Sequence, residues 1–159
     1  LPLLAITQDN GAVLRVDTEK EIITSEASIK SYKIIEKGDF IISLRSFQGG
    51  IEYSRVMGIC SPAYTILKSQ VEICDDFYRH YFKMADFISR LSATTVGIRE
   101  GKQISYSAFG TLKLVCPCLD EQQKIADCLS AIDTKIESVA KQIGQVESFK
   151  KGLLQKMFV

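Results

Sequence analysis

The carboxyl end of the chain decides the fold: residues 120–157 read DEQQKIADCLSAIDTKIESVAKQIGQVESFKKGLLQKM. Apolar side chains recur here at alternating spacings of four and three residues, which is the a/d heptad pattern of a coiled-coil helix. Asp120 is a good N-cap residue, and Gln123 three residues later completes a variant of the capping box. The sequence therefore predicts a single long helix over residues 120–157.

The apolar side chains form one stripe along this helix. Its positions are Ile125, Leu129, Ile132, Ile136, Val139, Ile143, Val146, Lys150, Leu153 and Met157, all apolar except Lys150. A helix of this length extends for about 57 Å, whereas a globular part formed by residues 1–118 has a radius of gyration of about 13–14 Å. The helix must therefore extend beyond the globular part, and its stripe needs a second helix. That helix can come from another copy of the chain, from another part of a longer chain or from a partner protein.

Two features of the stripe bear on how the helix is used. A long surface helix folded back onto the globular part is the alternative to pairing, but it would show a broader stripe with a period of 3.6 residues. Lys150 favours an antiparallel pair, because in a parallel in-register pair two Lys150 side chains would meet and repel. In an antiparallel pair each lysine stem can lie along apolar neighbours with its charge in water.

Residues 1–118 show shorter patterns of both strand and helix. Asn10-Gly11 between the apolar runs at 4–6 and 13–16 predicts a β-hairpin, since both residues tolerate positive φ. We expect further strands at 40–44, 55–59, 64–67 and 112–116, and a helix over 77–92 capped by Asp75 and Asp76. The predicted fold class is α+β: a small mixed α/β domain over residues 1–118, followed by a long coiled-coil-forming helix in a second region, residues 119–159.

Composition narrows the functional class. The chain has 159 residues, of which 46% are apolar and 25% charged, as in an average soluble globular protein, so disordered and fibrous classes are excluded. No run approaches the roughly 18 apolar residues of a membrane span, so no membrane partner is expected. Five cysteines at irregular spacing favour a reduced, cytoplasmic protein over a disulfide framework. The net charge of +1 neither favours nor excludes nucleic acid.

The phosphate-loop and nuclease patterns are both too weak to predict an enzyme. Residues 97–103 resemble a phosphate loop, but three residues instead of four separate the glycines, and Gln103 stands where Ser or Thr must reach Mg²⁺. Asp86, Glu100 and Lys102 fit a metal-dependent nuclease only through a short pattern that arises often by chance.

The other catalytic and metal patterns also fail. Residues 61–64, SPAY, lack the amide or carboxylate side chain and the second proline of the adenine methyltransferase motif. Cys116 and Cys118 have no second ligand pair for zinc. His80 lies in an aromatic stretch, where packing is commoner than general-base chemistry. We therefore predict no catalytic residue, no metal and no cofactor.

Five stretches carry a resemblance to a known family. They are residues 38–50 (GDFIISLRSFQGG), 61–64 (SPAY), 97–99 (GIR), 117–125 (PCLDEQQKI) and 150–158 (KKGLLQKMF). Together they resemble the target-recognition domain and helix of type I restriction–modification specificity subunits. The last two stretches are the most specific, and the resemblance covers essentially the whole chain. Family members usually carry two recognition domains and two helices, so we expect this chain to be a half-subunit, or the carboxyl-terminal half of a longer one with some leading residues missing.

The resemblance implies a function without catalysis. Each recognition domain of that family reads one half of a split site in double-stranded DNA, and the two helices pair antiparallel, set the spacing and dock the methyltransferase and restriction subunits. The alternative from the helix pattern alone is an assembly domain without DNA specificity.

Candidate DNA contacts follow from side-chain chemistry and loop position. Arg suits guanine O6/N7 and Gln suits adenine N6/N7, and both occur in loops loosened by glycine at 45–50 and 97–103. The candidate DNA-binding residues are Arg45, Ser46, Gln48, Tyr53, Arg55, Arg99, Lys102 and Gln103, with Arg79, Lys83 and Arg90 as further candidates for phosphate contact.

Overall fold

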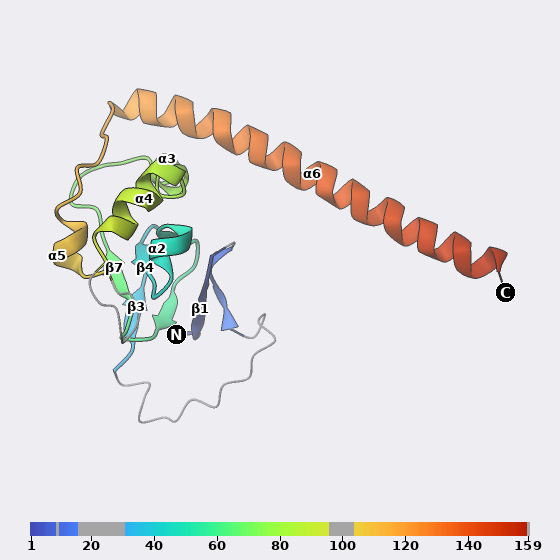
Figure 1. The fold of residues 1–159 in the computed structure, drawn as a ribbon, viewed down its shortest axis with the longest axis horizontal. Helices are drawn as coiled ribbons and strands as arrows, with labels where there is room; N and C mark the ends of the chain where they lie inside the picture. Colours follow the sequence, from blue (N-terminus) through green and yellow to red (C-terminus); the bar gives the residue numbers. More distant parts are fainter. Residues whose placement is uncertain (9, 16–30, 96–103, 159) are drawn as a thin grey trace.

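The computed structural model describes residues 1–8, 10–15, 31–95 and 104–158. Strands and short helices form a globular part, and one long helix extends from it (Figure 1). The predicted α+β class is confirmed.

The longest element is α6, Leu119–Met157, which has 39 residues. It starts beside α3 and runs well past the globular part (Figure 1). The prediction of one long helix is therefore confirmed, but the predicted capping box is wrong. The N-cap is Cys118, Asp120 lies in the first turn, and the Gln123 amide donates to Asp127 Oδ1 at 2.8 Å. The helix begins at Leu119 because Gln122 bonds backbone groups at its entrance, as described below.

The strands form three small antiparallel sheets. β1 (Leu4–Thr7) and β2 (Gly11–Leu14) are the predicted hairpin, with Leu4 opposite Leu14 and Thr7 opposite Gly11. β3 (Lys33–Ile35) pairs with β6 (Gly58–Cys60). β4 (Phe40–Ile42) lies between β5 (Glu52–Tyr53) and β7 (Thr65–Leu67).

The predicted strands differ from the observed ones where the chain lacks a neighbour. Residues 55–57 connect β5 to β6 instead of forming the strand predicted at 55–59. Residues 112–116 form no strand either: residues 113–116 are exposed and lead towards α6. A short apolar run becomes a strand only where another strand satisfies its backbone groups.

The helix predicted over residues 77–92 is two helices, α3 (Asp75–Tyr81) and α4 (Ala85–Ala93). Phe82 and Phe87 are both buried, with ring centroids 5.0 Å apart. In one continuous helix they would lie about 140° apart around the axis, so the chain must break between them to bury both. The N-cap of α3 is Cys74 rather than Asp75 or Asp76, which lie in the first turn. The short helices α2 (Ser46–Gly49) and α5 (Tyr106–Phe109) complete the fold.

Strand β4 separates the two halves of the core. Phe40 belongs to an aromatic cluster with α3 and α4, and Ile41 belongs to an aliphatic cluster beneath β1, β2, β3 and β6. Adjacent strand residues point to opposite faces, so β4 is buried on both sides. The loop that follows β4 therefore starts from a strand that is buried on both faces.

Candidate nucleic-acid interface

The loop between β4 and α2 is shaped by two serines. The Ser43 amide donates to Ser46 Oγ at 2.8 Å, and the Arg45 amide donates to Ser43 Oγ at 3.2 Å. Ser46 is only 1% exposed. These bonds fix the backbone on both sides of Arg45, whose side chain is exposed. The Arg45 side chain therefore projects into solvent from a loop whose backbone is held by hydrogen bonds.

The predicted DNA-binding residues divide by exposure. Arg45, Gln48 and Arg55 are exposed and available for contact. Ser46 is buried and its hydroxyl is used within the loop, so the structure gives it a shaping role and argues against the predicted contact. Arg99, Lys102 and Gln103 lie outside the described residues.

Tyr53 is also held within the fold. Its hydroxyl donates to Asp75 Oδ2 at 3.2 Å, and its ring lies 5.3 Å from that of Phe40. Burial, followed by the neighbouring Asp75, raises the pKa of Tyr53 to about 12. The phenol therefore stays protonated and links β5 to α3, which argues against the predicted DNA contact.

The candidate phosphate contacts on α3 and α4, and between them, are used internally. Lys83 bonds three acceptors of the chain, Arg79 bonds Asp76, and Arg90 bonds Asp86, Tyr81 and the Lys113 carbonyl. These cations stabilise the packing of the helices rather than forming an open phosphate-binding surface.

A different group of basic residues surrounds Tyr64, drawn from three separate segments. Burial raises the pKa of the Tyr64 phenol, and the charges of Arg15 and Arg45 act on it in the opposite direction. The Lys33 ammonium donates to the Tyr64 carbonyl at 2.6 Å. The sequence does not show this grouping, because only the fold brings Arg15 and Lys33 near Tyr64.

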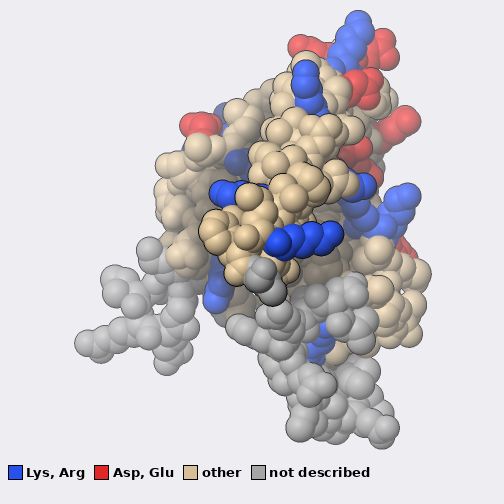
Figure 2. All heavy atoms as spheres, turned by 90° about the vertical axis from the view of Figure 1, so that its right-hand side faces the viewer, with Lys and Arg blue, Asp and Glu red and all other residues tan. Residues whose placement is uncertain are grey.

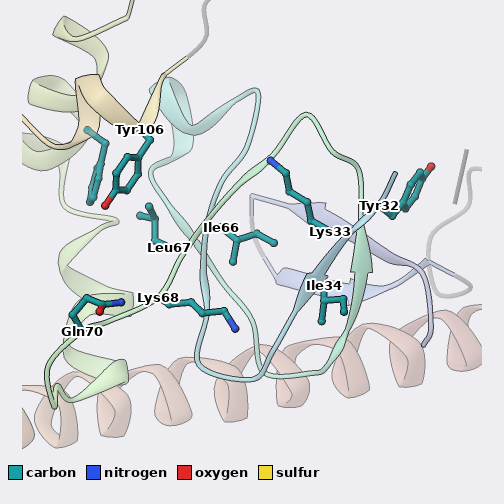
Figure 3. A pocket seen from close by; sticks show the side chains of 9 residues that line it. Tyr32, Lys33, Ile34, Ile66, Leu67, Lys68, Gln70 and Tyr106 are labelled. Carbon is teal, nitrogen blue, oxygen red and sulfur yellow. The ribbon is translucent and has the colours of Figure 1, made fainter. Parts of the chain in front are cut away.

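An open groove of about 670 Å³ lies on the surface beside Lys33 (Figure 3). Its lining includes Tyr32, Tyr106 and Leu67, together with Lys68, whose ammonium pairs with Glu36. Both lysines of the groove thus bond within the chain. The groove is aromatic and aliphatic rather than an anion site.

Charge on the surface is mixed. Viewed towards the carboxyl-terminal end of α6, lysine and arginine atoms are scattered over the face, and acidic atoms gather towards its upper right (Figure 2). The described residues of this face form no continuous basic field, in agreement with the net charge of +1. DNA binding by such a surface would depend on a small number of specific side-chain contacts rather than on a continuous positive charge.

Gln122 and Asp133 bond the first turns of α6 to α3 and to the segments next to it, and we call this contact the joint between α3 and α6. Gln122 is 1% exposed; its Oε1 accepts from the Cys74 amide at 2.9 Å and its Nε2 donates to the Pro117 carbonyl at 2.8 Å. One turn further along lies the buried Ala126. Asp133 then lies 3.5 Å from Arg79 Nη2 and 3.8 Å from His80 Nε2. These contacts fix the direction in which α6 leaves the globular part.

The predicted helix-pairing stripe begins at the edge of this contact face and turns away from it along the helix. At about 100° per residue, Leu129 lies within about 20° of Gln122 around the axis, whereas Ile125 and Ile132 lie about 60° and 80° from it. The exposed fractions along the stripe run from 36% at Ile125 to 72% at Met157. The stripe members are Ile125, Leu129, Ile132, Ile136, Val139, Ile143, Val146, Leu153 and Met157. The described part of the chain thus leaves all nine at least 36% exposed.

Other kinds of site are absent from the described residues. No group of His, Cys, Asp and Glu side chains there is arranged to hold a metal ion. All five cysteines are described and none is in a disulfide. Within the same ranges, no helix is both long and apolar enough to span a bilayer.

Comparison with known families decides the class. The family described as type I restriction modification DNA specificity domain matches residues 5–148, which is most of the chain. The chain belongs to this family. The predicted resemblance is confirmed, and so is the class of the chain: it is a DNA specificity domain, not an enzyme domain.

Relatives of this specificity domain come from Methanocaldococcus jannaschii. The chain is 28% identical over 126 residues to the type I restriction enzyme MjaVIII specificity subunit, and 28% identical over 125 residues to the putative type I restriction enzyme MjaX specificity subunit. Each match covers 79% of this chain and 29% of the relative. The specificity domain described here therefore spans less than a third of the relatives it matches.

Proposed function

We propose that this chain is the part of a type I specificity subunit that reads one half of a bipartite site in double-stranded DNA. Its globular part, residues 1–118, is the target-recognition domain, and residues 119–159 form the pairing and spacer region. The observation that carries the proposal is the exposure of two side chains after β4: Arg45 lies in the loop before α2 that the hydroxyls of Ser43 and Ser46 hold, and Gln48 lies in α2 itself. In this proposal the protein acts in the cytoplasm, on DNA.

The two exposed side chains have the chemistry for reading bases. A guanidinium can donate two parallel hydrogen bonds to guanine O6 and N7, and a carboxamide can pair with adenine N6 and N7. Because internal hydrogen bonds hold the loop backbone, little backbone conformational entropy is lost on binding. Arg55 serves a phosphate, and Arg99, Lys102 and Gln103 remain predicted contacts of a second loop.

The long helix supplies the second half of the proposal. Its stripe pairs antiparallel with an equivalent helix, either of a second copy or of the other half of the subunit. Linked domains at the two ends of such a pair raise the effective concentration of the second domain, so two weak half-site contacts combine into firm binding. In the proposal the paired helices also dock the methyltransferase and restriction subunits.

A selection from a random-sequence DNA pool tests this function. The full chain, with its methyltransferase partner present, should enrich one short motif in a salt-sensitive manner. Chains that pair through α6 but enrich no motif would instead be an assembly domain without DNA specificity.

A further inference from the structure

The Lys83 ammonium lies where three parts of the chain meet. Lys83 Nζ donates to the Glu52 carboxylate at 2.7 Å, to the Gly49 carbonyl at 2.9 Å and to the Gln8 carbonyl at 3.0 Å. A lysine ammonium has three donors, so all of them are used. Glu52 is only 1% exposed. Lys83 therefore joins the end of β1, the end of α2 and the buried strand β5.

Close backbone approach holds the same three parts together. A Cβ at Gly49 would lie 2.7 Å from Gln8 Nε2, and a Cβ at Gly11 would lie 2.3 Å from the Tyr53 carbonyl oxygen. Gly11 also has φ near +66°, where a side chain is strained. The hairpin turn thus packs directly against α2 and β5.

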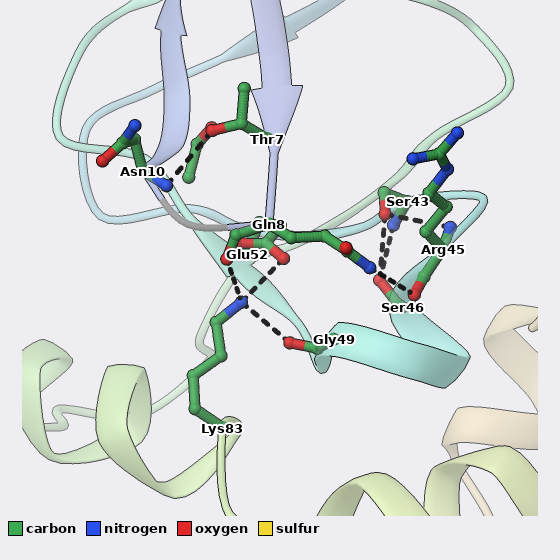
Figure 4. A network of polar contacts seen from close by, with 10 residues as sticks. Thr7, Gln8, Asn10, Ser43, Arg45, Ser46, Gly49, Glu52 and Lys83 are labelled. Atoms are coloured by element: carbon green, nitrogen blue, oxygen red, sulfur yellow. Dashed lines mark hydrogen bonds and ion pairs between the residues drawn. The ribbon is translucent and has the colours of Figure 1, made fainter.

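The side chains of this turn lie on the same side as the candidate reading loop. In Figure 4, Asn10 and Arg45 extend away from Lys83, and Gln8 lies between them. Gln8 Nε2 donates to the Arg45 carbonyl at 3.4 Å. Asn10 is exposed, and its carboxamide has both a donor and an acceptor pointing outward from the hairpin. Gln8 and Arg45, which are 37 positions apart in sequence, thus lie together on one polar edge of the surface.

We infer that Asn10 is a second base-reading residue of the specificity domain, and that Lys83 is the positioning residue that keeps it in register with Arg45. This inference rests on the proposed reading of DNA by the α2 loop. A carboxamide reads adenine through N6 and N7, so the partner of Asn10 is an A·T pair next to the base pairs read from α2. In this inference, the buried Lys83–Glu52 pair contributes to discrimination between bases as well as to the stability of the fold.

Asn10→Ala, in the full chain with its methyltransferase partner, tests the reading role. The motif selected from a random DNA pool should lose its preference at one A·T position, with affinity for the wild-type motif reduced by about 5- to 150-fold. Affinity for unrelated DNA should not change. Gln70→Ala, which removes an exposed carboxamide elsewhere on the surface, is the matched control and should leave the motif intact.

Lys83→Met tests the positioning role, with Lys68→Met as the matched control because Lys68 also pairs with a carboxylate. Lys83→Met should weaken the preference at the Asn10 position and at the Arg45 position together, while non-specific binding is retained. Lys83→Arg keeps the ion pair with Glu52 but not the compact triple contact, and it should restore discrimination in part. It is the variant to use if Lys83→Met lowers the melting temperature.

The outcomes separate this inference from the proposed function. If the wild-type chain enriches no motif, the proposed function fails. If it enriches a motif that Asn10→Ala leaves unchanged, the function stands and the reading role of Asn10 is overturned. If Lys83→Arg and Lys83→Met both retain full discrimination at both positions, the positioning role is overturned.

Discussion

Arg45 and Gln48 are exposed side chains whose neighbours in the loop are held by internal hydrogen bonds. In the proposed function, replacing either by alanine removes a pair of hydrogen bonds to one base and leaves the internal bonds of Ser43 and Ser46 in place. We expect Arg45→Ala and Gln48→Ala each to cost about 1–3 kcal/mol of binding and to relax the motif at one base pair. Titration of labelled duplexes carrying each base at each position measures both effects.

Two results would reassign these residues. Equal weakening on every sequence would make the residue a phosphate contact, and no change would remove it from the interface. Lys141→Ala on the exposed surface of α6 provides a charge-matched control for Arg45→Ala.

His80 makes the stability of the α3–α6 joint depend on pH. Burial and then the neighbouring Arg79 guanidinium lower the pKa of His80, against the opposing charges of Asp133 and Asp76. The folded protein therefore takes up this proton less readily than the unfolded chain does. The stability contribution is complete above the unfolded pKa of about 6.5 and is lost as the pH falls below it.

Urea unfolding at pH 7.5 and pH 5.5 measures this dependence. His80→Gln should lose less free energy of unfolding between the two pH values than the wild-type chain loses. Other groups titrate equally in both proteins, so the difference belongs to His80. A loss as large in the variant as in the wild type would contradict the assignment.

Among the elements, α6 depends on one buried amide at its start. Gln122→Ala leaves the Cys74 amide and the Pro117 carbonyl without their partner. An unsatisfied buried polar group costs about 1–3 kcal/mol, so we expect a loss of at least that size in the free energy of unfolding. The neighbouring Gln123 is exposed and bonds only Asp127. Gln123→Ala should therefore change stability by less than about 0.5 kcal/mol, and similar losses for both variants would argue against a bonded joint.

Elements fixed by local chemistry could be predicted from the sequence. The heptad pattern of α6 and the Asn10-Gly11 turn each fall within a short window, and both elements appear in the structure. The break between α3 and α4 depends on burying Phe82 and Phe87 in one cluster, and the failure of residues 112–116 to form a strand depends on the lack of a neighbour. Neither condition is visible in a short window of sequence.

The same limit applies to the site. Residue type and loop position predicted contacts at Arg45, Ser46, Gln48 and Tyr53. The structure shows Arg45 and Gln48 exposed, Ser46 buried and the Tyr53 hydroxyl bonded to Asp75. Arg15, Lys33 and Arg45 come near Tyr64, and Gln8 comes near Arg45, only through the fold. The sequence predicted which residue types could contact DNA but not which of their side chains are exposed.

For the whole molecule, the exposed stripe of α6 predicts association. Burying an Ile side chain contributes about 1.5–3 kcal/mol, and each substitution in a symmetric pair counts twice. We expect the wild-type chain to sediment as a dimer, and Ile136→Asp/Ile143→Asp to sediment as a monomer at high micromolar concentration.

The matched control places the same charges on the opposite face of the helix. Ser138→Asp/Gln145→Asp has the same seven-residue spacing, and both residues are exposed away from the stripe. This variant should remain dimeric. A wild-type chain that is monomeric at high micromolar concentration would count against self-pairing, and a parallel arrangement of the helices would contradict the proposed direction.

The joint between α3 and α6 is the point about which the rest of α6 would tilt. Beyond Asp133, the last residue of α6 bonded to α3, the helix continues for about 36 Å at its usual rise of 1.5 Å per residue. A tilt of about 5° at the joint moves the far end by about 3 Å, close to the rise of one base pair, about 3.4 Å along a strand. In the proposed function, the angular tolerance for placing two half-sites in register is therefore a few degrees, and the contacts of Gln122 and Asp133 set it.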